Sequence, residues 1–155
     1  MVMLSTRPAS LEDDLFLFQV YADTRMSEVA SWGWSDDQIQ QFLRMQYDAQ
    51  KRSYTMQSVS QREDIILYGE ERIGRWLTRE EDDVLTLVDI SLLKGFRNQG
   101  IGTDLIRHFQ QYAIDKIIPI ELHVMYGNPA YRLYERMGFE VTGEIPPYLA
   151  MKWTP

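Results

Sequence analysis

Three apolar segments with strand character follow one another in the middle of the chain, and they constrain the fold more than any other feature. They are residues 65–68, 72–77 and 84–92, all rich in branched or aromatic side chains. Short turns containing glycine or acidic residues, at 69–71 and 80–83, connect them. Turns of this length join antiparallel neighbours. The sequence therefore predicts an antiparallel sheet at the centre of the chain.

Helical signals lie on both sides of these strands. Near the N-terminus, residues 10–25 and 35–54 each start with a serine and nearby carboxylates, a pattern typical of helix starts. Four acidic residues are therefore interpreted as helix-start charges and not as ligands: Asp13, Asp14, Asp36 and Asp37. After the strands, residues 101–116 and 129–137 are predicted helices, the second ended by Gly138. The expected apolar face of the first comprises Ile101, Leu105, Ile106, Phe109, Tyr112 and Ala113.

Four further strands complete the expected order, βααβββαβαββ. They are residues 4–8, 119–124, 139–143 and 148–153. This order predicts an α/β protein of the α+β type, in which helices flank a mixed, mainly antiparallel central sheet. No repeat or linker interrupts the sequence, so residues 1–155 are expected to form a single domain.

Composition narrows the classes of function. The chain is 45% hydrophobic and 12% aromatic, enough for a compact core, and it has no cysteine for a disulfide, a thiolate zinc site or a cysteine nucleophile. No metal is expected. No apolar run approaches the roughly 20 residues of a spanning helix, and the start does not resemble a signal peptide, so a cytoplasmic protein without a membrane partner is expected. The net charge of −7 without a basic stripe argues against nucleic acid and favours cationic partners.

The sharpest local motif is Arg97-x-x-Gly100-x-Gly102, which follows a predicted strand and opens a predicted helix. The first N–H groups of a helix have no intrahelical partner and favour a pyrophosphate, and glycines let oxygen atoms approach the backbone. A tight strand-to-helix turn would have the same composition. A dinucleotide fingerprint does not fit, because its third glycine would fall at Leu105, and no Gly-Lys-Ser/Thr of a P-loop is present.

Two segments together resemble a known family. Residues 90–102 are similar to the acetyl-CoA motif of the GNAT N-acetyltransferase superfamily, and residues 122–139 are similar to its C-terminal motif. The resemblance spans about the last half of the chain. It implies the GNAT fold and transfer of an acetyl group from acetyl-CoA to a primary amine of a small molecule, an amino acid or a peptide. One departure is Lys94, where the superfamily often has a proline shortly before the aromatic at Phe96. We expect this change to affect loop stiffness and hardly to touch the chemistry.

The resemblance also assigns roles. The Leu92 N–H is the candidate donor to the thioester oxyanion, and Tyr134, four residues before Gly138, is the candidate acid that protonates the leaving thiolate. Tyr134 also fits an aromatic core position. Asn128 fits both a hydrogen bond to pantetheine and a cap for the following helix. The expected contacts of acetyl-CoA are Leu92, Arg97, Asn98, Gln99, Gly100, Ile101, Gly102, Thr103, Asn128 and Tyr134.

The base that deprotonates the amine has two candidates. Asp89 stands in an apolar strand, where it fits a base acting through water or the end of a hydrogen-bond network. Glu28, expected in the loop between the first two helices, fits a base or a contact for a cationic acceptor. His123 is interpreted as structural and His108 as solvated.

The same connection holds Trp32 and Trp34, which fit either the wall of an acceptor pocket or a seal over the core. The helical stripe Phe42, Gln46, Gln50 and Tyr54 fits either the lining of the substrate cleft or a half-buried flank of its helix, and we favour the flank. A monomer or homodimer is expected. A non-catalytic GNAT-fold module that binds acyl-CoA as a sensor or a protein-interaction partner is the alternative to an enzyme.

Overall fold

The computed structural model describes residues 3–57 and 60–155, with the side chains of residues 53–57 left out of the description. The strands are β1 (Leu4–Pro8), β2 (Gln61–Tyr68), β3 (Glu71–Glu81), β4 (Val84–Leu92), β5 (Ile120–Met125), β6 (Glu140–Ile145) and β7 (Tyr148–Trp153). The helices are α1 (Asp14–Val29), α2 (Asp36–Gln57), α3 (Ile101–Lys116) and α4 (Ala130–Arg136), with short 3-10 turns at Leu11–Asp13, Ala30–Trp32 and Lys94–Phe96. The expected order of elements and the expected fold class are confirmed.

The strands follow the order β1-β2-β3-β4-β5-β7-β6 in the sheet. Two residues separate β3 from β4, and both, Asp82 and Asp83, have positive φ angles of 53° and 60°. Two such residues in succession are typical of the hairpin turn whose twist matches that of its strands. The predicted antiparallel meander thus turns at Asp82 and Asp83, and β3 is longer than the sequence indicates.

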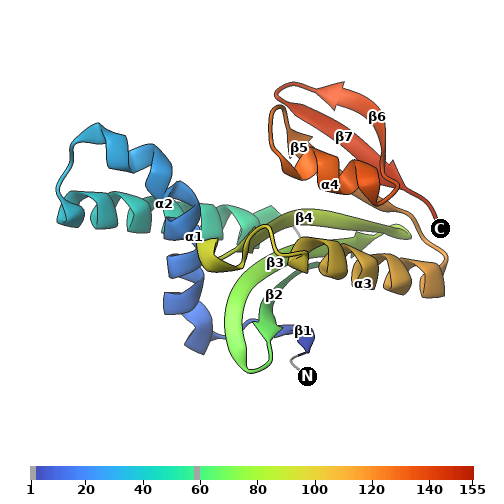
Figure 1. Cartoon of the computed structure of the whole chain (residues 1–155), viewed down its shortest axis with the longest axis horizontal. Helices are drawn as coiled ribbons and strands as arrows, with labels where there is room; N and C mark the ends of the chain where they lie inside the picture. Colours follow the sequence, from blue (N-terminus) through green and yellow to red (C-terminus); the bar gives the residue numbers. More distant parts are fainter. Residues whose placement is uncertain (1–2, 58–59) are drawn as a thin grey trace. The chain divides into compact units, whose positions relative to one another are not determined.

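One compact unit comprises the described residues up to Arg75 together with residues 91–95. In it α1 packs against α2 and crosses it at an angle (Figure 1), and β1 pairs antiparallel with β2. Two clusters fill its interior: Phe16, Leu17, Val20, Tyr47 and Ile65 form one, and Ala22, Val29, Ile39 and Leu43 form the other. The Ser35 backbone N–H donates to the Gln38 side chain at 2.9 Å, and the Gln38 N–H donates to the Ser35 hydroxyl at 3.2 Å. This reciprocal pair confirms the predicted start of α2.

A buried acidic group ties β1 and β3 to the start of α1 in the same unit. The side chain of Asp13 is only 2% exposed and forms ion pairs with Arg7 at 2.8 Å and Arg72 at 3.1 Å. It also accepts the Ser10 backbone N–H at 2.9 Å. Asp13 is thus a helix-start charge, as predicted, and in addition it links three elements.

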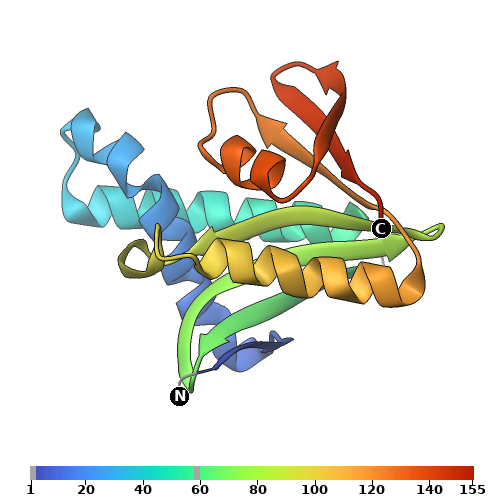
Figure 2. The ribbon, with the colours of Figure 1, turned by 45° about the vertical axis from the view of Figure 1, so that its right-hand side comes forward.

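The second compact unit comprises residues 76–90 and 96–155. In it β4 pairs in parallel with β5 through Leu85–Leu87 and Ile120–Leu122, and α3 is the crossover that a parallel pair requires. The α3 side chain Phe109 packs its ring against Trp76 at 5.0 Å between centroids. Strand β5 pairs antiparallel with β7, which forms the C-terminal hairpin with β6 (Figure 2).

Two details differ from the sequence-based prediction. Helix α1 ends at Val29, not near Arg25, because Val29 is buried in the second cluster and so draws another turn into the helix. On α3, Tyr112 is 41% exposed, and its hydroxyl donates to Glu80 at 2.5 Å. Gln110 is buried instead, because its side-chain amide donates to the Met137 carbonyl at 2.7 Å.

Candidate functional site

The glycine motif forms the turn that opens α3. Asn98 and Gly100 have positive φ angles of 60° and 81°, and Gly100 is the N-terminal cap of the helix. The N–H groups of Ile101, Gly102 and Thr103 belong to the first helical turn, where no intrahelical acceptor exists. Left-handed residues beside a helix start turn successive N–H groups toward one point and favour an anion there. The turn is therefore suited to a phosphate.

The two glycines of this turn have different surroundings. A Cβ built on Gly100 would meet no atom of the described residues within 4 Å, whereas one on Gly102 would lie 3.1 Å from Leu133 Cδ2. Gly102 thus lets α3 start close to α4. In contrast, the space next to the Gly100 Cα is open, so a ligand can approach the backbone there.

Tyr134 lies on α4 with its side chain buried, 6% exposed. Its ring packs against Phe139 at 5.9 Å between centroids. Burial raises the pKa of Tyr134 to about 12, and the negative charge of Asp89 adds to the rise. The phenol therefore keeps its proton at neutral pH and can donate it. The core position anticipated for Tyr134 is confirmed, and its role as an acid stays a prediction.

Asp89 belongs to the same unit as Tyr134 and lies on β4. The pairing of β4 with β5 covers Leu85–Leu87, so Asp89 comes two residues after it. One carboxylate oxygen of Asp89 accepts the Ile90 N–H at 3.0 Å. The structure thus brings the candidate base Asp89 and the candidate acid Tyr134 into electrostatic contact.

Leu92 ends β4 and belongs to the first unit. A Cβ on Gly74 of β3 would overlap the Ser91 carbonyl oxygen and lie 3.1 Å from Leu92 Cα, so only glycine fits there. The next N–H groups are held as well: Leu93 donates to the Ile73 carbonyl at 2.8 Å, and Lys94 donates to the carboxylate of Asp23 at 2.6 Å. Sequence reasoning missed Asp23 and Gly74, since neither belongs to a motif.

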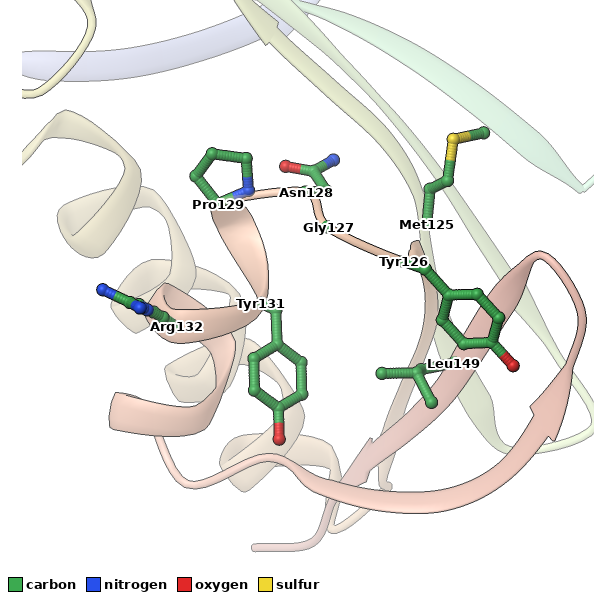
Figure 3. A pocket seen from close by; sticks show the side chains of 8 residues that line it. All are labelled: Met125, Tyr126, Gly127, Asn128, Pro129, Tyr131, Arg132 and Leu149. Atoms are coloured by element: carbon green, nitrogen blue, oxygen red, sulfur yellow. The ribbon is translucent and has the colours of Figure 1, made fainter.

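Asn128 caps α4 from the preceding loop. Its side-chain oxygen accepts the Ala130 N–H at 2.9 Å, which confirms the capping role and leaves the amide N–H groups to donate elsewhere. Asn128 also lines a hollow of about 480 Å³ in the second unit. Figure 3 shows the rings of Tyr126 and Tyr131 on either side of Leu149, with Asn128 and Pro129 at the rim. The hollow is mainly apolar and suits an apolar group with an amide.

The candidate acceptor residues belong to the first unit. Glu28 is exposed and lies in the last turns of α1, not in the loop as predicted, because α1 continues to Val29. Trp32 and Trp34 are 47% and 41% exposed, and their rings are 5.1 Å apart between centroids. Both rings also contact Phe42 on α2, at 5.4 and 5.3 Å. We call Trp32, Trp34 and Phe42 the aromatic cluster.

Other candidates are placed as follows. His108 is exposed on α3, as expected, and His123 is exposed on β5, where it pairs with Ala150 of β7. The side chain of Tyr54 lies outside the described residues. In the described part of the chain, no group of three or more histidine, cysteine or acidic side chains is arranged to hold a metal. Within the described ranges, no helix has the length and apolar character needed to cross a membrane.

Comparisons with known proteins add an independent finding. The model of the acetyltransferase (GNAT) family matches residues 18–139. No curated protein sequence matches significantly. Among solved structures, the PaiA N-acetyltransferase of Thermoplasma acidophilum, in complex with coenzyme A, is 18% identical with a TM-score of 0.74, and the alignment covers 99% of both chains.

Two further structures are similar over nearly the whole chain. The ribosomal-protein-S18-alanine N-acetyltransferase of Escherichia coli is 16% identical with a TM-score of 0.68, over 98% of this chain and 94% of that one. Naa50 of Arabidopsis thaliana, in complex with the bisubstrate analogue CoA-Ac-MVNAL, is 18% identical with a TM-score of 0.62, over 98% and 99%. At these identities the likeness shows the fold.

Proposed function

Because the chain belongs to the GNAT acetyltransferase family, we propose that it transfers an acetyl group from acetyl-CoA to a primary amine of a small molecule, an amino acid or a peptide. The observation that carries the proposal is the turn at Arg97–Gly102. Left-handed residues Asn98 and Gly100 precede the first turn of α3 there, a geometry that suits the pyrophosphate of acetyl-CoA. The solved relatives in complex with coenzyme A or a CoA conjugate support the same ligand.

The proposed reaction is a direct attack on the thioester. The amine nitrogen forms a bond to the acetyl carbonyl carbon, and the carbonyl oxygen gains negative charge that the Leu92 N–H stabilises. The carbon–sulfur bond then breaks, and the thiolate takes a proton from Tyr134. No protein nucleophile is needed, since a thioester is already activated. Amide and free CoA thiol are the products.

Proton transfer completes the cycle. An amine with a pKa near that of lysine, about 10.4, is mostly protonated at neutral pH and must lose a proton before attack. Asp89 is our first candidate for this base, acting through water, because its charge already acts on Tyr134. Starting from the ammonium ion, the nitrogen loses two protons. The proton lost before attack passes through Asp89 and water to the solvent, and the proton lost after the carbon–nitrogen bond forms replaces the one that Tyr134 gives to the thiolate. Glu28 is the second candidate.

We further propose that the acceptor is cationic and meets the region around the aromatic cluster. Residues 26–43 contain three acidic side chains, Glu28, Asp36 and Asp37, and no lysine or arginine. All three are exposed. Negative charge next to aromatic rings favours an ammonium group both by Coulomb attraction and by contact with the ring faces.

The direct test is a panel of amines, amino acids and short peptides, in which release of free CoA thiol from acetyl-CoA is followed. At least one amine should give turnover above hydrolysis, with an acetylated product of the expected mass. Binding of acetyl-CoA without thiol release from any acceptor would instead favour the non-catalytic module. The expected cytoplasmic location, the single domain and the monomeric or dimeric state stay predictions.

A further inference from the structure

The end of β4 is held by two neighbouring elements of its own unit. Immediately after Leu92, the Leu93 N–H donates to the Ile73 carbonyl of β3 at 2.8 Å, and the Lys94 N–H donates to Oδ2 of Asp23 at 2.6 Å. Asp23 lies in the middle of α1, 71 residues away in sequence. Hydrogen bonds to a carboxylate are shorter and stronger than those between neutral groups. The backbone after Leu92 is therefore fixed to α1 as well as to the sheet.

The residue that donates to Asp23 is the one that departs from the family pattern. GNAT sequences often have a proline shortly before the aromatic corresponding to Phe96, and here the position is Lys94. A proline has no N–H and could not make this bond, but its ring would itself stiffen the backbone. The bond from Lys94 to Asp23 supplies from α1 the restraint that a proline supplies locally.

We propose that Asp23 is a positioning residue for acetyl transfer. By holding the Lys94 N–H, its carboxylate fixes the end of β4 and so orients the Leu92 N–H toward the thioester oxygen. Asp23 does not touch the substrate. The inference rests on the proposed function, since it assumes that Leu92 acts on the thioester. It differs from the expectation, drawn from the sequence, that Lys94 hardly touches the chemistry.

The geometry around Leu92 explains why a loss of this bond should affect catalysis. Gly74 packs directly against Ser91 and Leu92, so the strand end has little freedom on the β3 side. On the C-terminal side of Leu92, the Lys94 N–H is held by the carboxylate of Asp23. An oxyanion donor stabilises charge only when it is aimed at the oxygen, and displacements of about 1 Å can cost about 100-fold in rate.

The test uses three variants of the full chain. Asp23→Ala should lower kcat roughly 10-fold or more, with the KM for acetyl-CoA within about twofold of wild type. Asp23→Asn keeps a side-chain oxygen that accepts the Lys94 N–H and should restore most of the lost rate. Glu70→Ala, which removes an exposed carboxylate from the turn between β2 and β3 of the same unit, is the matched control and should behave like wild type.

A second background separates positioning from any other role of Asp23. Lys94→Pro should be nearly as active as wild type, and adding Asp23→Ala to it should cost less than about twofold. If Asp23→Ala lowered kcat as much in the Lys94→Pro protein as in the wild type, the proposal would be overturned. An Asp23→Ala enzyme with a lowered melting temperature and an unchanged kcat would overturn it too. Should Asp23→Ala not fold alone, the Asn variant and the Lys94→Pro pair decide the same question. A wild-type protein that releases no CoA thiol would contradict the proposed function, not Asp23.

Discussion

The charge of Asp89 acts on the buried phenol of Tyr134 and adds to the rise in its pKa that burial causes, to about 12. The two residues come from β4 and α4, 45 positions apart in the sequence, yet they form one electrostatic pair. A carboxylate next to a neutral phenol can take a proton while the phenol gives one. Two of our predictions follow from this pair.

Removing the phenol hydroxyl should separate chemistry from binding. Tyr134→Phe should lower kcat about 100-fold or more while the KM for acetyl-CoA barely changes, because only the proton donor to the thiolate is lost. Steady-state kinetics with a saturating acceptor measures this. Tyr131→Phe is the matched control: it removes a hydroxyl that donates to Glu135 on the same helix, and it should leave kcat within about twofold. Equal effects of the two changes would remove Tyr134 from the mechanism.

Neutralising Asp89 should make Tyr134 easier to ionise. The negative charge of Asp89 disfavours the phenolate, so Asp89→Asn should bring the pKa of Tyr134 below about 12 but leave it above the usual value of about 10, because burial remains. Carbon-13 NMR of labelled tyrosine against pH measures the shift, with Tyr134→Phe to assign the signal. Glu121→Gln, at an exposed position of β5, should not move it. A pKa that is unchanged or higher in Asp89→Asn would contradict the pairing.

A bulky charged side chain in the first turn of α3 should abolish cofactor binding. Acetyl-CoA should raise the melting temperature of the wild type, since a ligand that binds only the folded state stabilises it. Gly102→Glu should eliminate this rise, because its side chain would crowd Leu133 of α4 and would bring a negative charge to the first turn of α3, where the phosphate is expected. Gly102→Ala adds a Cβ near the flexible Leu133 side chain and should retain part of the rise. Gly143→Glu, with open space around it on β6, should retain all of it.

Asp13 should make the fold sensitive to acid. The hydrogen bond from Arg7 holds the pKa of Asp13 well below its usual range, although burial opposes it. This stabilisation is fully present above the unfolded pKa of about 3.9 and is lost as the pH falls through the lower folded value. Asp13→Asn should lower the free energy of unfolding at neutral pH by about 2 kcal/mol, since the charge-assisted hydrogen bonds of the buried carboxylate are lost while Arg7 and Arg72, each 41% exposed, stay hydrated. Urea unfolding between pH 7 and pH 2 should show a flatter acid dependence in Asp13→Asn than in exposed Asp37→Asn.

The aromatic cluster should affect the acceptor alone. Trp34→Ala removes the ring that packs against both Trp32 and Phe42 and should raise the acceptor KM roughly 10-fold, by analogy with the loss of a cation–ring contact of about 1 kcal/mol or more. Trp34→Phe should be milder. Glu28→Gln should raise the same KM. The KM for acetyl-CoA should stay unchanged in all three. A loss of acetyl-CoA binding, or no effect on either substrate, would show that the cluster is structural.

Local signals predicted the elements well. The capping pair of Ser35 and Gln38 and the acidic residues before α1 mark helix starts that the structure confirms, because their hydrogen bonds are made within a few residues. The helix ends were harder. The end of α1 depends on the burial of Val29 against α2, and sequence periodicity does not show which neighbour covers a residue.

The parts of the candidate site that depend on contacts between distant residues could not be predicted from the sequence. The glycine turn was found because its conformation needs glycine locally, at Gly100. The charge of Asp89 on Tyr134 and the bond from Lys94 to Asp23 depend on how strands and helices pack, and no spacing rule links them. The helical spacing predicts that Tyr112 lies on the apolar face of α3. A tyrosine can instead turn its hydroxyl to a surface carboxylate, and Tyr112 donates its hydroxyl to Glu80.

The bond between Lys94 and Asp23 has an evolutionary consequence. A relative with proline at the position of Lys94 has no N–H there, so selection has no reason to keep a carboxylate at the position of Asp23. A relative with any other residue at that position gains from one. The two positions should therefore covary among homologues, and a chimera that takes α1 from a proline-bearing relative should inherit a poorly ordered strand end unless residue 94 is exchanged with it.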